Sequence, residues 1–275
     1  MRFSQLLCIS VLLVSCSQAK DVDLLTIYTS RQPQLIEPLL EQYKEKTGIE
    51  VRLLSGKAPQ LMERIAVESD MTEADIFMTV DAGVLWQAGE KGILEDINSK
   101  ILNENIPEHL RDASGKWFGL SKRARTIVYN SDKVSTDELS SYKDLADPKW
   151  ANKLCLRTST KVYNRSLIAS MIDADGYKNT KNIVQGWVNN LATEVFSSDT
   201  QVLKAVSAGQ CNVTIVNTYY LARLADDPTY SNLKLHWANQ DGRGTHVNIS
   251  GAGVTKYSKN KVEATKLLEW LSSAE

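Results

Sequence analysis

The sequence predicts an α/β protein with largely parallel sheets. Strand-like and helix-like segments alternate from Leu24 onward, which is the pattern of βαβ units. The chain has 275 residues, of which 43% are hydrophobic and 24% charged, so it can form one large core or two lobes. Two long segments, 117–129 and 239–253, are suited to cross between lobes. These observations favour a two-lobed molecule with hinge strands.

Hydrophobic periodicity gives the first elements. Residues 24–28 form a buried strand, Pro33 starts a helix with an apolar face, and Gly48 ends it. The next strand covers 49–54 and completes a βαβ unit. The same pattern predicts a helix over 61–68, a strand over 74–80 and a helix over 82–88.

The crossing segments differ in composition. Residues 117–129 read as a long strand that is interrupted by Gly119 and a basic cluster. Residues 239–253 contain several glycines, which permit close backbone approach and unusual dihedral angles. We expect the first segment to be one hinge strand and the second to be the return crossing. A final helix is predicted over 261–271.

The N-terminus predicts an export signal over residues 1–19. Arg2 is followed by the apolar run 6–14, which is too short to span a bilayer. Small residues at 17–19 suit ordinary signal peptidase, whereas 13–16 resembles a lipobox in which Cys16 would carry lipid. We favour soluble export, because strand-like sequence begins at Leu24 and leaves little tether after Cys16.

Two cysteines, Cys155 and Cys211, remain after the signal region. A cysteine pair in an oxidising compartment suggests a disulfide, and the alternative is two unpaired buried thiols. Each cysteine opens an apolar run. A bridge would therefore hold two strands side by side.

Three tyrosines follow these cysteines at matching distances. Tyr163 lies eight residues after Cys155, Tyr219 lies eight after Cys211, and Tyr220 is adjacent. This placement could bring three phenols together at the ends of two strands. Phenolate is a hard oxygen donor that suits Fe(III). The alternative is that the tyrosines are amphipathic wall residues whose hydroxyls form hydrogen bonds.

Other functional classes find little support. A formal charge of -1 gives no net basic field for nucleic acid. His109, His236 and His246 are widely separated, so a zinc enzyme is not expected and each histidine is interpreted as a surface or packed residue. Serine-hydrolase and phosphate-loop motifs are absent from the sequence. The sequence has no recognisable acid/base pair of the kind that would indicate an enzyme.

Seven segments, in their order and spacing, resemble the periplasmic ferric ion-binding proteins of bacterial ABC importers. They are YTSRQ at 28–32, ADIFMTVDAG at 74–83, WFGLSKRAR at 117–125, DPKW at 147–150, YNRSL at 163–167, NTYY at 217–220 and NQDGRGTHVN at 239–248.

The resemblance implies a two-lobed type II periplasmic binding protein fold, with metal bound in the cleft between lobes and delivered to a membrane permease. We expect lobe 1 to contain residues 20–122 and 248–275, and lobe 2 to contain 123–247. Family members usually continue beyond the helix that ends near 271, so we expect the sequence to be incomplete at its C-terminus.

By the same resemblance, Tyr163, Tyr219 and Tyr220 are the metal ligands. The chain departs from the family at Gln32 and Pro33, where many members carry a His-Tyr pair or a histidine. Some relatives also have a glutamate where this chain has Val80, although Asp81 is next to it. Because three tyrosines leave a six-coordinate Fe(III) incomplete, we expect carbonate, another small anion or water to complete the coordination.

The anion needs hosts of its own. The turn formed by Ser30, Arg31 and Gln32 precedes a predicted helix N-terminus, where backbone donors favour negative charge, and Arg31 adds a planar fork of donors. Arg123 is the second host by family position. Arg125 has the same side-chain parity on the strand and stays an alternative host. The other alternative is that Lys122, Arg123 and Arg125 form a solvated basic face that binds no anion. Asn217 is a candidate second-shell donor to the tyrosinates.

We therefore expect a monomeric, non-enzymatic carrier of Fe(III) in the periplasm, with an inner-membrane ABC permease as partner. One alternative is a carrier of another anion or a polyamine on the same fold. The other is an extracytoplasmic enzyme with a tyrosinate-iron site.

Overall fold

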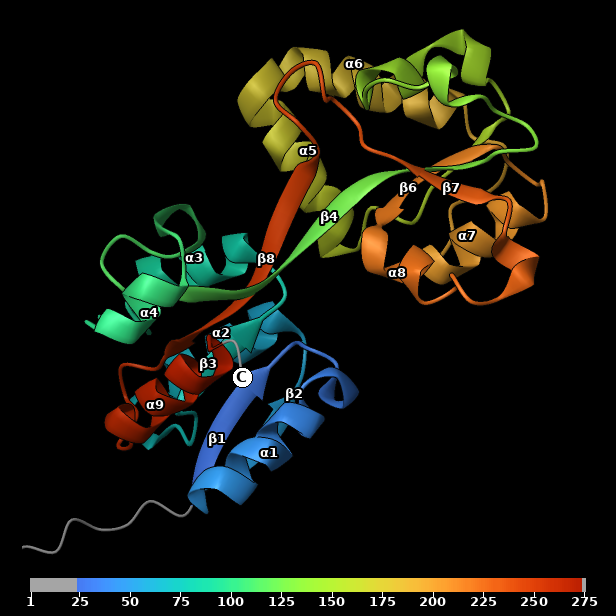
Figure 1. Ribbon diagram of the computed structural model, residues 1–275. Helices are drawn as coiled ribbons and strands as arrows, with labels where there is room; N and C mark the ends of the chain where they lie inside the picture. The colour runs from blue at the N-terminus through green and yellow to red at the C-terminus, as the bar shows by residue number, and fades with distance from the viewer. Residues whose placement is uncertain (1–23, 274–275) are drawn as a thin grey trace, which may run out of the picture.

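The computed structural model describes residues 24–273 and has two lobes joined by a pair of long strands (Figure 1). The predicted signal peptide and Cys16 lie outside the described residues. Within 24–273, no helix is long and apolar enough to cross a membrane.

Lobe 1 contains the N-terminal βαβ units. Its strands are β1 (Leu24–Thr29), β2 (Glu50–Ser55) and β3 (Ile76–Thr79), and β1 pairs in parallel with the other two. The helices of this lobe are α1 (Glu37–Thr47), α2 (Ala58–Glu68), α3 (Ala82–Glu90), α4 (Lys100–Asn105) and the C-terminal α9 (Lys261–Leu271). The predicted strands and helices are confirmed to within a few residues, and α9 has the predicted bounds.

The start of the first helix is the exception. Pro33 opens a separate 3₁₀ turn, Pro33–Leu35, and the α-helix begins only at Glu37. Ile36 lies between them at φ -128°, outside the helical region, and so interrupts the run of helical residues.

Two strands cross between the lobes, as the sequence predicted. They are β4 (Phe118–Asn130) and β8 (His246–Val254), and they pair antiparallel from Phe118 opposite Ala252 to Arg125 opposite His246. At its C-terminal end, β8 also pairs antiparallel with β3 in lobe 1. The far half of β4 continues into lobe 2, where β6 and β7 flank it.

Lobe 2 is built around the far half of β4. Its other strands are β5 (Leu154–Cys155), β6 (Val213–Asn217) and β7 (Leu233–His236), and its helices are α5 (Val162–Asp175), α6 (Tyr177–Asn189), α7 (Asp199–Ser207) and α8 (Thr218–Ala222).

The prediction of largely parallel sheets is wrong. The sheet order is β2-β1-β3-β8-β4-β6-β5, with β7 beside β4, and every pairing of β4 or β8 is antiparallel. Among the strands of residues 24–273, the pairs β1-β2, β1-β3 and β5-β6 alone are parallel. The cause is the connectivity, because two crossing strands that run in opposite directions must pair antiparallel with each other.

Each lobe has its own hydrophobic core. Leu25, Ile27 and Met78 pack with Leu267 and Leu268 of α9, and a second cluster in this lobe surrounds Ile65 and Phe77. In lobe 2, one cluster surrounds Trp150 and Trp187, and another packs Val202 and Val206 against the cysteines. The exact lobe limits, 122/123 and 247/248, stay a prediction. Both fall in the crossing strands, where Arg123 lies opposite Asn248.

The predicted disulfide is present. Cys155 and Cys211 are bridged, with their Cα atoms 5.8 Å apart. Cys155 ends β5, which pairs in parallel with β6, and Cys211 lies just before β6. The bridge therefore fixes β5 against β6, the two strands that lead toward the tyrosines.

Gly251 allows the crossing strands to pack closely in lobe 1. A Cβ atom at this position would lie 2.3 Å from the carbonyl oxygen of Phe118, which is backbone and cannot rotate away. Only a residue without a side chain fits here, which confirms the close approach that the glycines of this segment predicted.

We expect Gly251→Ala to lower the free energy of unfolding by about 1–3 kcal/mol through overpacking. Urea denaturation measures the change. Gly242→Ala is the matched control, because a Cβ there meets nothing closer than 3.9 Å. Equal stability of the two variants would contradict the explanation.

Candidate metal centre

A cleft of about 480 Å³ lies between the lobes. Lobe 1 contributes the end of β1 and the residue after β3, the crossing strand β4 forms the back, and lobe 2 contributes the starts of α5 and α8. The lining residues are Ser30, Arg31, Gln32, Leu35, Val80, Ser121, Lys122, Arg123, Arg157, Lys161, Val162, Tyr163, Tyr219, Tyr220, Arg223 and Ser250.

All three predicted tyrosines line this cleft. Tyr219 and Tyr220 lie in α8, which starts immediately after β6, and their ring centroids are 4.3 Å apart. Tyr163 lies in the first turn of α5 rather than at the end of β5. The structure thus brings the three phenols together, with a strand end supplying two of them and a helix start supplying the third.

The environment of Tyr219 favours the protonated phenol. Burial raises the pKa of Tyr219 well above its ordinary value of 10, and the neighbouring Tyr163 and Tyr220 raise it further. The amide of Asn217 acts in the opposite direction. A neutral phenol binds metal weakly, so a bound cation has to displace its proton.

Guanidinium groups lie over the tyrosine rings. The Cζ atom of Arg123 is 4.9 Å from the centroid of Tyr163, and that of Arg157 is 5.5 Å from the same ring. Arg223 lies 5.2 Å from the ring of Tyr219. Such cation-π contacts are worth about 2 kcal/mol when desolvated. They would strengthen if the rings became phenolates, because full opposite charges would then face each other.

Arg31 and Arg123 hold unused donors against the cleft. The Nε of Arg31 and both Nη atoms of Arg123 are buried without a hydrogen-bond partner. Burial lowers the pKa of both arginines. Arg31 lines the cleft from lobe 1, and its Nη1 donates to Ser121 Oγ on β4 over 3.2 Å. Unpaired buried N–H groups are costly, so both side chains are suited to receive an anion.

The backbone of the predicted anion turn is already occupied. The N–H of Ser30 donates to Met78 O and the N–H of Arg31 donates to Thr29 Oγ1. The α-helix also begins later than predicted. The backbone N–H groups of Ser30 and Arg31 are therefore not free to bind an anion, whereas the Nε of the Arg31 side chain is. Gln32 lines the cleft but is exposed, and its Oε1 accepts from Gln34.

Arg123 and Arg125, the two candidate anion hosts on β4, lie in different surroundings. Arg125 is 1% exposed and its Nη1 lies 3.1 Å from Asp199 Oδ2, inside lobe 2. Only Arg123 lines the cleft. Asn217, also buried, accepts from Arg125 through Oδ1, and its Nδ2 has no partner.

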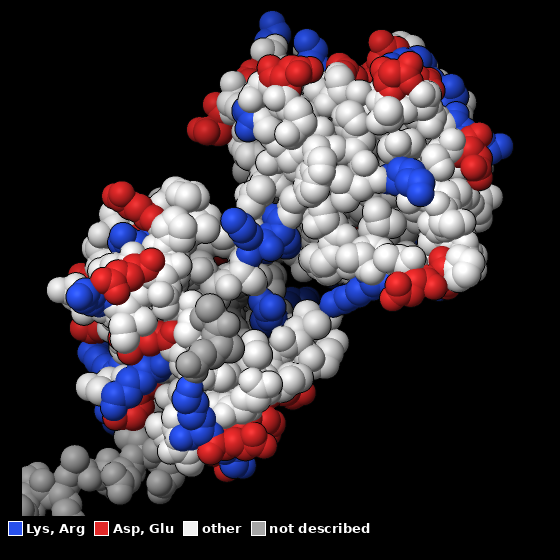
Figure 2. Space-filling view, viewed as in Figure 1, with Lys and Arg blue, Asp and Glu red and all other residues white. Residues whose placement is uncertain are grey.

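Three basic residues of the cleft were not predicted: Arg157, Lys161 and Arg223. Each lies within six residues of a cleft tyrosine, and Arg223 is three positions after Tyr220, a spacing that puts helical neighbours on one side. This closeness in sequence to the tyrosines was the one feature of the sequence that could have identified them as cleft residues. The six basic lining residues face no aspartate or glutamate among the lining residues that the structure describes. Figure 2 shows basic side chains gathered where the lobes meet.

Asp81 follows Val80, the position at which some relatives have a glutamate, but its carboxylate is bound to groups outside the cleft. Its Oδ1 accepts from Val84 N at the start of α3 and its Oδ2 accepts from Asn248 Nδ2. It does not line the cleft. In the part of the chain that the structure describes, no group of three or more His, Cys, Asp or Glu residues could hold a metal ion.

His246 is enclosed rather than exposed. It shares a narrow space with Arg123, Arg125 and Tyr163. Burial lowers its pKa to about 4, and the charges of Arg123, Arg125 and Arg243 contribute in the same direction. The imidazole is therefore neutral at physiological pH, in agreement with a packed residue.

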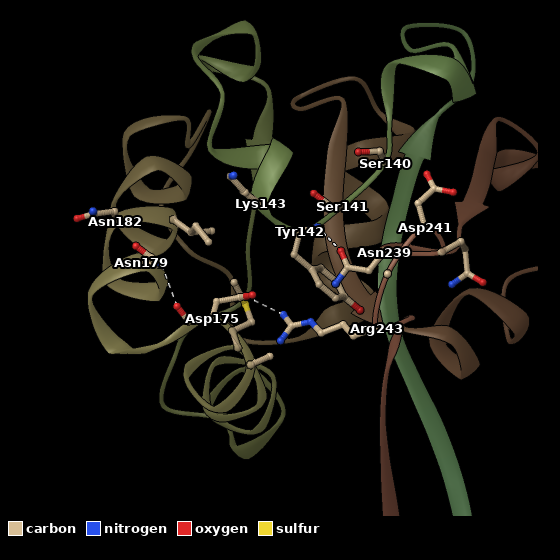
Figure 3. A pocket seen from close by; sticks show the side chains of 15 residues that line it. Ser140, Ser141, Tyr142, Lys143, Asp175, Asn179, Asn182, Asn239, Asp241 and Arg243 are labelled. Carbon is tan, nitrogen blue, oxygen red and sulfur yellow. Dashed lines mark hydrogen bonds and ion pairs between the residues drawn. The ribbon is translucent and has the colours of Figure 1, made fainter.

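A larger hollow of about 760 Å³ lies within lobe 2, away from the tyrosines. It is bounded by α5, α6 and the segment before β8 (Figure 3). Arg243 projects at its wall and pairs with Asp175 at 3.2 Å. Neither a cleft tyrosine nor a cleft arginine lines it. Size alone therefore does not identify the site.

Asn248 tethers the lobes beside the cleft. Its Nδ2 donates to Asp81 Oδ2 over 2.9 Å and also to Ser166 Oγ on α5, and its Oδ1 accepts from Ala82 N. Asp81 and Ala82 belong to lobe 1, and Ser166 lies one turn after Tyr163 in lobe 2. This one amide therefore links α3 with the helix that carries Tyr163.

The sequence profile of the family described as bacterial extracellular solute-binding protein matches residues 28–275. A Synechocystis protein named Iron uptake protein A1 is 43% identical over 279 residues, which cover 96% of this chain and 78% of that protein. Iron uptake protein A2 from the same organism is 40% identical over 257 residues, covering 90% and 73%.

Solved structures agree. A Trichodesmium protein in complex with iron and citrate is 45% identical, with a TM-score of 0.84 over 91% of this chain and 81% of that one. A ferric binding protein from Campylobacter jejuni is 37% identical, with a TM-score of 0.85 over 90% and 81%. The architecture is thus the two-lobed type II periplasmic binding protein fold.

We expect Asn248→Ala to lower the free energy of unfolding by about 1–3 kcal/mol, because it leaves the buried Asp81 carboxylate without one of its donors. Small-angle X-ray scattering should also show a larger radius of gyration, since the tether between lobes is lost. Asn189→Ala, on the exposed face of α6, is the control. An unchanged radius would show that Asn248 does not restrain the lobes.

Proposed function

Because the chain belongs to the family of bacterial extracellular solute-binding proteins, we propose that it binds Fe(III) between its lobes and delivers it to an ABC permease. The observation that carries this proposal is the meeting of Tyr163, Tyr219 and Tyr220 in one cleft. The iron-associated names of its relatives support the same cargo.

Phenolate chemistry explains the choice of metal. Three phenolates supply hard oxygen ligands and cancel the charge of a trivalent cation. The raised pKa of Tyr219 makes a weakly polarising cation a poor competitor for its proton. Soft ligands do not line the cleft in the described part of the chain. The site is therefore suited to Fe(III) rather than to zinc or copper(I).

The basic lining calls for a bound anion as well. Arg157 is paired with the buried Asp199, but no aspartate or glutamate among the described lining residues balances the other lysine and arginine charges of the cleft once three phenolates neutralise the iron. We propose that carbonate or another small anion completes the coordination and is held by Arg31 and Arg123, whose buried donors are unpartnered. Gln32, which lines the cleft, is a further polar contact for the anion, and the free Nδ2 of Asn217 is a donor for the tyrosinates.

Closure of the lobes would complete the site. The tyrosines belong to lobe 2, whereas Arg31 extends from the end of β1 in lobe 1. Bending of β4 and β8 moves these groups relative to each other. The iron is captured by the tyrosines, the anion is covered from lobe 1, and reopening with protonation of the phenolates releases both.

We place the mature protein in the periplasm as a monomeric carrier without catalytic activity. Soluble export is the form we favour, and a lipid anchor through Cys16 is the alternative. Both forms keep the cleft outside the cytoplasm, where an inner-membrane permease accepts cargo.

A second candidate is a carrier of a free anion. Six basic residues line the cleft, which favours an anion and disfavours a polyamine by like-charge repulsion. A Salmonella typhimurium relative at 24% identity is named a putative 2-aminoethylphosphonate-binding protein. The tyrosine cluster favours iron over this candidate, because a free anion does not need three converging phenols.

Titration of the mature protein with ferric citrate should produce a visible tyrosinate-to-iron charge-transfer band. Phenylalanine at position 163, 219 or 220 removes one phenolate, and we expect each substitution to weaken iron binding by more than about 100-fold, beyond the usual cost of losing a supporting residue. Tyr177→Phe, on the exposed face of α6, should leave the band unchanged. Absence of the band in the parent protein would refute the proposed function.

The pH dependence follows from the raised pKa of Tyr219. Below that pKa the phenol is protonated, so iron binding must release its proton, and affinity falls as the pH falls. We expect a loss of up to about tenfold per pH unit for each phenol proton displaced. Equilibrium competition against a chelator from about pH 8 to about pH 6 measures the slope. Tyr219→Phe should reduce the slope, and a flat profile would mean that the phenols do not ionise on binding.

A further inference from the structure

We infer that Arg125 is a positioning residue that holds the two tyrosine-bearing segments of lobe 2 in fixed register, an inference that rests on the function proposed above. Arg125 lies on β4 and does not line the cleft. Its side chain is almost fully buried, and its guanidinium donates to three separate segments of lobe 2.

The first arm fixes the segment that carries Tyr163. Arg125 donates from Nε over 3.0 Å and from Nη2 over 2.6 Å to Asn164 Oδ1. The Nδ2 of Asn164 then donates to the carbonyl oxygen of Arg157 over 2.7 Å. Asn164 directly follows Tyr163, so this amide joins the first turn of α5 both to β4 and to the loop before the helix.

The second arm fixes the segment that carries Tyr219 and Tyr220. Arg125 donates from Nη1 to Asn217 Oδ1 over 3.2 Å and from Nη2 to Ile215 O over 2.9 Å. These acceptors lie at the end of β6, immediately before α8. One planar group thus connects both ligand-bearing segments.

The same contact sets the orientation of the Asn217 amide. A guanidinium has no acceptor, so the amide oxygen must face Arg125. The Nδ2 then faces away from the guanidinium, and both residues border the narrow space that Tyr163 also lines. Because that Nδ2 is buried without a partner, it remains available to donate to a phenolate.

A buried ion pair keeps Arg125 in place. Asp199, 0% exposed, accepts from Arg125 Nη1 over 3.1 Å. Arg157 approaches the same carboxylate at 3.6 Å. The charge of Arg125 would be unpaired in any orientation away from Asp199, so its side chain cannot swing toward the cleft without a large cost.

Lysine cannot reproduce this arrangement. Its ammonium is a point charge that can pair with Asp199, but it lacks the planar fork that reaches Asn164 and Asn217 together. A ligand set has to be held to within about 0.5 Å of its productive geometry, and the groups that support the ligands provide that restraint. Arg125→Lys therefore separates positioning from charge.

The experiment compares Arg125→Lys with Asn190→Ala in the full mature chain. Asn190 is another buried amide of lobe 2, whose Nδ2 donates to Leu145 O and Asp147 O, away from the cleft. Ferric citrate titration gives the iron affinity and the charge-transfer band, and thermal unfolding gives the stability of the iron-free protein. We expect Arg125→Lys to weaken iron binding by about 10- to 100-fold and to shift the band. Asn190→Ala should lower stability without either effect.

Hydrogen exchange of the iron-free proteins provides a test that does not need iron. Arg125→Lys should accelerate exchange in residues 157–166 and 215–220 together, and Asn190→Ala in neither. Unchanged exchange in these two segments overturns the positioning role, whatever the iron titration gives. An affinity loss shared by both variants in proportion to their stability also overturns it. By contrast, if the parent protein shows no charge-transfer band, the proposed iron binding is refuted. The hydrogen-exchange result then still tests whether Arg125 holds the two tyrosine-bearing segments in place.

Asn164→Ala serves if Arg125→Lys does not fold. It removes the first arm and keeps the Arg125–Asp199 pair and the second arm. Exchange should then increase in 157–166 alone, with a smaller loss of iron affinity. Equally accelerated hydrogen exchange in residues 215–220 would contradict the inference that Arg125 holds the two segments through independent sets of hydrogen bonds.

Discussion

The antiparallel pairing of β4 with β8 is the constraint on which the rest of the structure depends. These strands are the chain's crossings between the lobes within the described residues, and they also supply side chains to the region between them. Arg123 lies on β4 directly opposite Asn248 on β8. One side chain faces the cleft, while the other bridges α3 and α5. The same two strands therefore join the lobes and contribute to the wall of the cleft, so bending them would change the cleft.

Electrostatics make the cleft incomplete without cargo. Basic side chains surround the three phenols, and burial raises the pKa of Tyr219 well above its ordinary value. Burial also leaves several N–H groups of the cleft arginines without partners. Iron and an anion would relieve both deficits, because phenolates would form beneath the guanidinium groups and the anion would occupy the free donors. The network beneath the tyrosines is different in kind. There Arg125 and Asp199 satisfy each other, so we expect this network to hold its segments in place rather than to bind cargo.

The sequence predicted most of the local structure, and the three tyrosines that it singled out line one cleft. Hydrophobic periodicity located β1, β2, β3 and α9. Burial of one or both faces of these elements is visible in the spacing of apolar residues within each segment. The strand directions were wrong, since pairing depends on partners far along the chain. The start of α1 was also misplaced, because Pro33 suits a 3₁₀ turn as well as an α-helix.

Within the site, the difficulty was orientation. Arg123 and Arg125 have the same strand parity, and what distinguishes them is the set of buried partners of Arg125, which lie 39 to 92 residues away in sequence. Arg157 and Arg223 lie near the tyrosines in sequence, but nothing local shows that they point into the cleft. The tyrosines were singled out by their spacing after the two cysteines and then by the family resemblance, and Tyr163 lies in the first turn of a helix instead of at the end of a strand.

The central claim is that Tyr163, Tyr219 and Tyr220 together bind Fe(III). Anomalous diffraction at the iron absorption edge, from crystals of iron-loaded mature protein, tests it most directly. We expect one strong anomalous peak within bonding distance of the three phenolic oxygens and beside Arg31 and Arg123. A peak in the lobe 2 hollow near Arg243, or an iron atom that contacts none of the tyrosines, would contradict the claim.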